Sequence, residues 1–241
     1  MLLRIRIQNF LSFQKETSFD MLTDPKIEGL PHHISKDTPL PLLKQAAIYG
    51  ANGAGKSNLI KAFVFLKNWG TNPKCLEEIE VCDYSFRMTD EDTKPPICLE
   101  VEFLSHQKAY LYKVAISEES IEESLYLSGL GKSADTLIFE RKDSKLIKHS
   151  LLNESAINEL LTTNKKASLL TLHQGLGASY NPELKSAYEW FEQQLCIVKY
   201  PSDNLQLAKE LTSDEKLFDF VEDIIQSCDL DIDGIEREEN S

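Results

Sequence analysis

The sequence predicts an α/β fold in which a strand–loop–helix unit is followed by an antiparallel meander of strands and then by further helices. Three observations predict it. A short apolar run, a glycine-rich loop and a helix-periodic stretch follow one another over 46–66. Closely spaced alternating segments occupy 99–148, and helical spacing returns after Leu151. We therefore expect three parts, residues 1–95, 96–149 and 150–241.

The first part opens with a strand. Leu3, Ile5 and Ile7 alternate with Arg4 and Arg6, which is the period of a half-buried strand. A second extended piece is expected over 12–19. Residues 24–43 hold four of the nine prolines and predict a loop.

The core unit follows this loop. Ala46–Tyr49 is a short apolar run that stops at Gly50, as a buried strand would. From Ser57 onward, apolar residues recur at helical spacing up to Leu66, and Gly70 with Pro73 predicts the end of that helix.

The middle part predicts a meander of strands. Alternating segments lie at 99–104, 110–116, 121–127, 136–140 and 145–148. The gaps are too short for crossover helices, so the connections must be hairpins and the strands antiparallel. After residue 150 we expect helices, including an amphipathic one around Leu217–Ile225, and an acidic end over 229–241.

One motif carries chemistry. Residues 50–57 match G-x-x-x-x-G-K-[ST], between a predicted strand and a predicted helix. Glycines let successive backbone N–H groups turn inward around phosphate oxygens, and the helix dipole points at the same anion. We expect Lys56 to reach the β- and γ-phosphates of ATP and the Ser57 hydroxyl to coordinate Mg²⁺. The predicted nucleotide-binding residues are Gly50, Ala51, Asn52, Gly53, Ala54, Gly55, Lys56, Ser57 and Asn58.

Charge and composition limit the partners. The 241 residues carry a net charge of −13, divided as +4 over residues 1–70 and −17 over the remainder. An acidic body disfavours nonspecific nucleic-acid binding, which needs phosphate-neutralising Lys and Arg. No apolar run approaches the length of a membrane span, and the five cysteines form no C-x-x-C pair. We therefore expect a soluble, reduced, cytoplasmic protein with no membrane partner.

The acid that ATP hydrolysis requires is not visible in the sequence. A catalytic acid of this kind follows a run of apolar strand residues. Glu140, at the end of the predicted strand 136–140, comes nearest, but Arg141 and Lys142 follow it, and we favour an ordinary meander strand. The glycine-rich stretch Leu127–Ser133 resembles an ABC-type LSGG signature, but a strand follows it, so it predicts a hairpin turn.

The opening Leu3–Phe13 resembles the "I-x-N-F-x-S-F" start of RecF/SMC/OLD-type ABC-like ATPases, and Gly50–Leu59 resembles their P-loop. Residues 84–87, 99–104, 123–126 and 138–141 are similar to small bacterial AAA-type ATP-binding proteins of phage-defence and abortive-infection operons. The resemblance implies a RecA-like core with an antiparallel β subdomain and a helical arm. It implies ATP and Mg²⁺ as cofactors, with adenine contacts around Ser12 and Phe13.

The resemblance also implies partners. Heads of this type dimerise with ATP between a P-loop and the opposite signature motif, and an effector such as a nuclease is encoded nearby. The signature motif and the catalytic acid of such heads lie in a C-terminal half. We therefore expect this chain to be an N-terminal portion that ends before them.

Three functions compete at this stage. The first is the ATPase subunit of a bacterial anti-phage defence system, which would be the enzyme in its complete assembly. The second is a DNA-repair or chromosome-associated head, which the acidic body disfavours. The third is a nucleotide-binding scaffold that does not hydrolyse ATP.

Overall fold

The computed structural model describes residues 1–24, 31–35, 37–88, 95–151, 153–173, 181–198 and 213–227. The chain forms two compact units, Met1–Cys196 and Ile197–Ser241. The first unit is a sheet with helices on one face, and it contains the glycine-rich loop.

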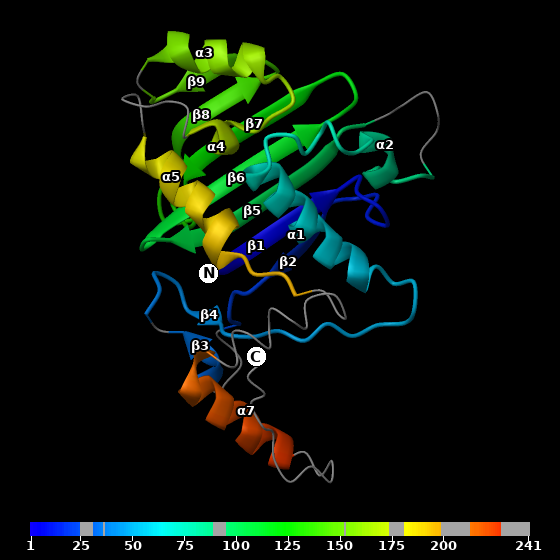
Figure 1. Ribbon diagram of the computed structural model, residues 1–241, viewed down its shortest axis with the longest axis vertical. Helices are drawn as coiled ribbons and strands as arrows, with labels where there is room; N and C mark the ends of the chain where they lie inside the picture. Colours follow the sequence, from blue (N-terminus) through cyan, green and yellow to red (C-terminus); the bar gives the residue numbers. More distant parts are fainter. Residues whose placement is uncertain are drawn as a thin grey trace, which may run out of the picture. The chain divides into compact units, whose positions relative to one another are not determined.

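A seven-stranded antiparallel sheet organises the first unit (Figure 1). Its strand order is β2-β1-β5-β6-β7-β8-β9, so consecutive strands from β5 onward are joined as a meander. The strands are β1 (Leu2–Gln8), β2 (Thr17–Asp20), β5 (Ile97–Ser105), β6 (Lys108–Ile116), β7 (Ile121–Leu127), β8 (Thr136–Lys142) and β9 (Lys145–His149). The predicted alternating segments are confirmed as these strands, and the mixed α/β class is confirmed with them.

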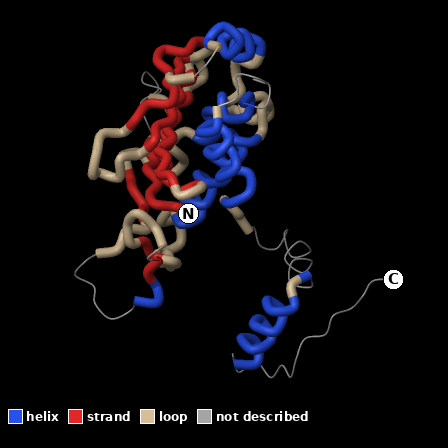
Figure 2. Tube along the Cα trace, turned by 90° about the vertical axis from the view of Figure 1, so that its left-hand side faces the viewer, coloured by secondary structure: helices blue, strands red, loops and turns tan. Residues whose placement is uncertain are grey.

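The two faces of the sheet differ in chemistry. Ile5, Val101, Tyr112, Leu125 and Phe139 are register partners across five strands, and all are buried. The helices cover this face, as the edge-on view shows (Figure 2). Since side chains alternate along a strand, the neighbouring positions point to the other face.

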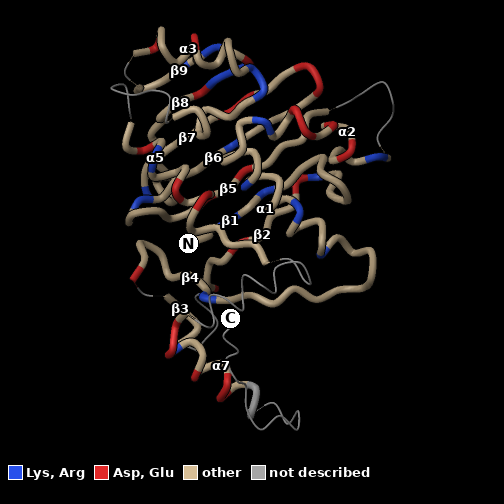
Figure 3. The backbone as a smooth tube through the Cα atoms, viewed as in Figure 1, with Lys and Arg blue, Asp and Glu red and all other residues tan. Residues whose placement is uncertain are grey.

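That other face is charged. It carries a row in which Arg6 and Lys113 both pair with Glu100. Basic and acidic residues are interspersed along the strands (Figure 3). This division into one packed and one polar face is what the alternation in the sequence predicts.

Helix α1 (Lys56–Thr71) crosses the buried face and begins at the glycine-rich loop. Its buried side includes Leu59, Phe63, Leu66 and Trp69, at helical spacing. The other helices described beside the sheet are α2 (Val81–Tyr84), α3 (Glu154–Thr163), α4 (Leu169–Leu172), α5 (Pro182–Glu189) and the π-helix η3 (Trp190–Gln194). Helix α1 packs against α4 and η3, while α3 packs against β9.

The loop predicted over 24–43 contains small regular elements. They are the 3₁₀ helix η1 (Pro31–His33) and the strands β3 (Ile34–Ser35) and β4 (Leu42–Leu43), which pair with each other. Leu42 joins Leu3, Leu104 and Ala109 in a small apolar cluster. This cluster fixes one end of the segment against the main sheet.

The second unit contains α7 (Glu215–Ser227), the amphipathic helix that the sequence predicts. Asp214 caps it, because its carboxylate accepts a hydrogen bond of 3.1 Å from the Leu217 amide. The predicted acidic end, 229–241, lies outside the described residues.

Two expectations about segments have clear outcomes. The stretch Leu127–Ser133 runs from the last residue of β7 into its connection with β8, which confirms the predicted hairpin turn. The predicted buried strand Ala46–Tyr49 is wrong: these residues belong to no strand, and Ile48 and Tyr49 are 42% and 89% exposed. Among the described residues no strand lies beside Ala46–Tyr49 to form backbone hydrogen bonds with it. Apolar composition alone therefore does not bury the segment.

The expected three-part division stays a prediction. One sheet joins strands from both sides of residue 95, because β1 pairs with β5. Helices α3, α4 and α5 belong to the same compact unit as that sheet, and the second unit begins at Ile197.

Candidate nucleotide-binding site

At two positions the glycine-rich loop has a backbone conformation that only glycine adopts readily. Gly53 has a φ of 83° and Gly55 a φ of 94°, both left-handed. Gly55 is also the N-cap of α1, and no side chain caps that end of the helix. A Cβ at Gly55 would lie 2.8 Å from the Ser12 hydroxyl oxygen, so both the backbone and the space require glycine there.

The loop and the first turn of α1 offer open N–H groups. The Asn58 and Leu59 amides donate to the Gly55 carbonyl at 2.9 and 3.1 Å. Within the described residues, the amides of Gly53, Gly55, Lys56 and Ser57 have no acceptor. Unsatisfied donors at the positive end of a 16-residue helix form a site suited to an anion.

The Lys56 side chain lies against its own loop. Its ammonium Nζ donates to the Gly50 carbonyl at 2.6 Å and to the Ala51 carbonyl at 2.8 Å. A phosphate group would compete with these two neutral acceptors and attract the ammonium more strongly, because the bond would join opposite charges. Lys56 is therefore held at the loop, where it can exchange carbonyl partners for phosphate oxygens.

Mg²⁺ and ATP fit the chemistry of these groups. Ser57 is exposed at the first turn of α1, so its hydroxyl oxygen is accessible to a metal bound between it and phosphate oxygens. No group of three or more His, Cys, Asp or Glu residues in the described part of the chain is arranged to hold a metal by itself.

The turn after β1 forms the neighbouring wall. Asn58 Nδ2 donates a 2.9 Å hydrogen bond to the Ser12 hydroxyl, and the Phe13 ring lies 3.6 Å from the Cβ position of Gly55. We predicted Asn58 as a nucleotide-binding residue from the sequence. In the structure its side-chain amide donates to Ser12. No sequence spacing indicates this contact, since 46 residues separate the partners.

Glu140 is placed away from this site. It lies on β8, paired with Ser124 and Lys148. Strand β8 is four positions from β1 in the sheet, roughly 19 Å at the usual strand spacing. Glu140 therefore lies on an ordinary strand of the meander, as the sequence favours.

None of the helices that the structure describes has the length and apolar character that a membrane crossing requires.

Open amides and left-handed glycines at the start of a helix, with the Lys56 ammonium held beside them, are the features of a P-loop. The model of one family, "AAA domain, putative AbiEii toxin, Type IV TA system", matches residues 46–224, well over half of the chain. The chain belongs to that family.

Comparison with solved structures gives a weaker likeness. A chain from a study described as the structural biochemistry of ATP-driven dimerization and DNA-stimulated activation of SMC ATPases is 14% identical, with a TM-score of 0.33. The match covers 80% of this chain and 99% of that one. A similarity at this level assigns no role to any residue here. No curated protein is similar enough in sequence to count as a match.

Proposed function

We propose that this chain binds ATP with Mg²⁺ at the loop 50–57 and acts as the ATPase subunit of a bacterial anti-phage defence system. The observation that carries the binding step is the set of open amides on Gly53, Gly55, Lys56 and Ser57 beside the Lys56 ammonium. A triphosphate would satisfy the amides and draw Lys56 from the Gly50 and Ala51 carbonyls. Membership of the abortive-infection-type AAA family supports the defence role.

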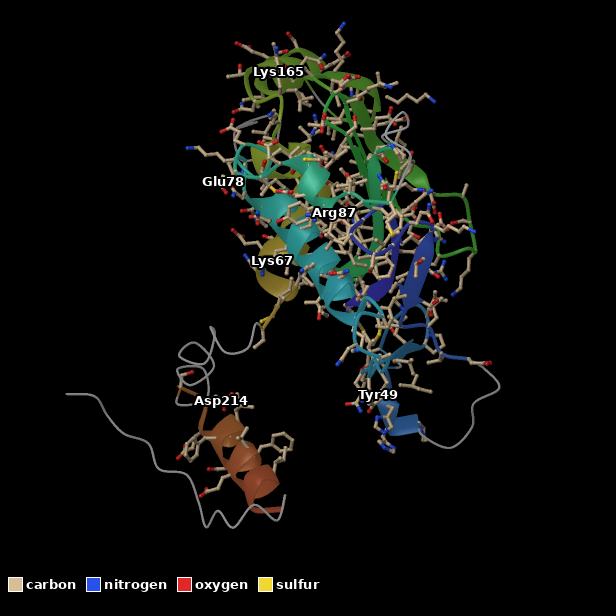
Figure 4. The ribbon with its side chains drawn as sticks, turned by 90° about the vertical axis from the view of Figure 1, so that its right-hand side faces the viewer. Tyr49, Lys67, Glu78, Arg87, Lys165 and Asp214 are labelled. Atoms are coloured by element: carbon tan, nitrogen blue, oxygen red, sulfur yellow. The ribbon has the colours of Figure 1, made fainter. Side chains whose placement is uncertain are left out.

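We further propose that the assembled protein hydrolyses ATP with an acid from outside the described residues. The support is the exposed apolar segment Ala46–Tyr49 immediately before the loop, with Tyr49 projecting from the connection that leads into α1 (Figure 4). A strand added beside this segment would bury it and place a new strand end next to the phosphates. An acidic residue at that end would hold Mg²⁺ and orient the attacking water.

Nucleotide binding would drive two heads together, because the γ-phosphate and Mg²⁺ add contacts that exist only in the closed dimer. The dimer would control an effector, such as a nuclease encoded nearby. In this scheme ATP binding shifts the population of heads between a free and a paired state.

The defence role is tested by phage plating on bacteria that carry the complete locus. We expect the wild-type locus and a Lys61→Ala control to reduce plaque formation, and Lys56→Ala to restore it. Lys61 lies on the same helix and is exposed, so its loss changes the charge but not the loop. Undiminished protection by Lys56→Ala would overturn the proposal.

Hydrolysis is tested separately by steady phosphate release from the assembled complex. We expect release that Lys56→Ala abolishes. If ATP binds to the loop and no phosphate is released by any assembly, the nucleotide-binding scaffold is the better description.

A further inference from the structure

Two adjacent hollows border residues 72–80, which join α1 to α2. The first has a volume of about 510 Å³ and lies between α1 and α2. The second has a volume of about 460 Å³ and lies between the β6–β7 turn and the residues that join α3 to α4. Ile79 and Glu80 line both hollows, so the two form one continuous surface, which we call the double groove.

The floor of the first hollow is apolar and preformed. Its apolar residues include Leu11, Val64, Phe65 and Ile79, of which Phe65 is buried and the others are partly exposed. The Tyr84 ring contacts Phe65 at 5.2 Å between centroids, and the Tyr84 carbonyl accepts from the Leu11 amide at 2.7 Å. Because these contacts already fix the floor, a partner would bind it with little loss of conformational freedom.

The rim of the double groove is acidic. Its carboxylates belong to Glu78, Glu80, Asp83, Glu118, Glu119 and Asp143. The basic side chains that line it, Lys61, Lys165 and Lys166, are half as many. A partner that fits this rim therefore carries positive charge.

Glu80 is the carboxylate best placed to meet such a partner, since it is exposed and borders both hollows. Its carboxylate has no partner among the described residues. In contrast, Glu78 accepts a hydrogen bond of 3.0 Å from Asn72, and Asp83 lies 3.9 Å from Arg87. A free carboxylate beside an apolar floor favours a partner that brings a cation together with apolar side chains.

The shape of the partner follows from the elements around the double groove. The edge strands of the main sheet are β2 and β9, and neither lines it. Within the part of the chain that the structure describes, the double groove thus offers no strand edge with which an extended segment could pair. A helix satisfies its own backbone hydrogen bonds and can present apolar and basic side chains on one face.

We propose that the double groove docks a basic amphipathic helix of a partner protein. Apolar side chains of that helix would enter the hollows, and its Lys or Arg side chains would pair with Glu80 and the neighbouring carboxylates. No residue of the loop 50–57 lines the double groove, so this inference does not rest on nucleotide binding.

Fluorescence anisotropy with the full chain and two labelled peptides, in the absence of nucleotide, tests the inference. One peptide is an amphipathic helix of Leu and Lys with the Leu residues on one face, and the other has Glu in place of Lys. We expect the full chain to bind the Leu/Lys peptide at least about tenfold more tightly than the Leu/Glu peptide, because the rim is acidic.

Two variants and one control locate the bound peptide. Glu80→Lys should weaken binding of the Leu/Lys peptide about fivefold, and Ile79→Ser about tenfold, since each changes a residue that both hollows share. Glu16→Lys makes the same change of charge at an exposed position on the charged face of the sheet. This control should bind the peptide within about twofold of wild type.

Several results would overturn the inference. Failure of the Leu/Lys peptide to bind, or equal binding of both peptides, would contradict a basic partner. Equal losses in Glu80→Lys and Glu16→Lys would assign binding to the net charge of −13. A loss in Glu80→Lys with none in Ile79→Ser would leave an acidic patch without apolar docking. Self-association of the wild-type chain that Glu80→Lys abolishes would assign the surface to a second copy.

Discussion

The indole Nε1 of Trp69 donates a 2.7 Å hydrogen bond to the phenol oxygen of Tyr112, which joins the last turn of α1 to the centre of the sheet. Tyr112 in turn donates to the Glu123 carboxylate at 2.7 Å. Burial, followed by the charge of Glu123, raises the pKa of Tyr112, so the phenol stays a donor. The helix that starts at the glycine-rich loop is therefore bonded to a buried polar network.

Arg141 completes this network, and its truncation should lower the free energy of unfolding strongly. Its side chain and that of Glu123 are both fully buried, with Nε donating to the carboxylate at 2.5 Å. Arg141 also donates to the Ala167 carbonyl at 2.8 Å. We expect Arg141→Met to lower the free energy of unfolding in urea by about 3–5 kcal/mol, because it leaves a buried carboxylate unpaired.

The matched control for that prediction is the double variant Arg141→Met with Glu123→Gln. Neutralising the carboxylate removes the unpaired charge, so the double variant should be more stable than Arg141→Met alone. Additive losses from the two substitutions would contradict the paired-charge explanation.

Glu183 should make stability depend on pH. Burial raises the pKa of this carboxyl, but hydrogen bonds from Lys108 and Tyr110 and the Lys108 charge outweigh it and leave the pKa lowered. A lowered folded-state pKa stabilises the fold above the ordinary pKa of 4.5, and this stabilisation is lost as the pH falls through the folded value. Glu183→Gln should cost about 1 kcal/mol at pH 7 and much less in acid.

Urea unfolding of wild type and Glu183→Gln at several pH values measures this effect. Glu159→Gln, which replaces an exposed carboxylate on α3, is the control for the loss of one surface charge. A constant difference between wild type and Glu183→Gln at all pH values would show that Glu183 contributes through packing instead of charge.

Gly70 of α1 packs against Phe191 of η3. A Cβ at this position would lie 3.1 Å from the Phe191 ring, which is fully buried beside Trp190 and Tyr112. Gly70→Ala gains about 1 kcal/mol of helix propensity but overpacks a ring that Trp190 and Tyr112 enclose, at a cost of about 1–3 kcal/mol. We expect a lower thermal midpoint. A higher midpoint would mean that Phe191 can shift.

The cysteines should differ sharply in reactivity. Burial and the charge of Glu78 raise the pKa of the Cys75 thiol to about 12, whereas Cys82 is exposed. At pH 8 only about one Cys75 thiol in ten thousand would be ionised. We expect iodoacetamide to label Cys82 at least about 100-fold faster than Cys75, by peptide mass spectrometry. Comparable rates in folded protein, with no acceleration of Cys75 in urea, would contradict the buried environment.

Local patterns predicted most of the fold. The alternation of apolar and polar residues around Leu99–Phe103 and Tyr110–Ile116 predicted strands, because each strand has one packed and one charged face. The glycine-rich loop was equally visible, since its residues are consecutive and its chemistry depends on backbone conformation.

Long-range contacts could not be predicted in the same way. Ala46–Tyr49 has the composition of a buried strand, but burial depends on a neighbour that no local pattern specifies. The Ser12–Asn58 and Asn9–Pro95 contacts join residues 46 and 86 positions apart. Glu123 and Arg141 look like surface charges in the sequence, and only their pairing across β7 and β8 explains why they are buried.

The most direct test of nucleotide binding is calorimetric titration of the purified chain with Mg-ATP. We predict measurable binding by wild type and by Lys61→Ala, and at least about tenfold weaker binding by Lys56→Ala, because a charge-assisted contact to phosphate is lost. Equal affinity of the wild-type and Lys56→Ala proteins would contradict the assignment of the loop 50–57 as the nucleotide site.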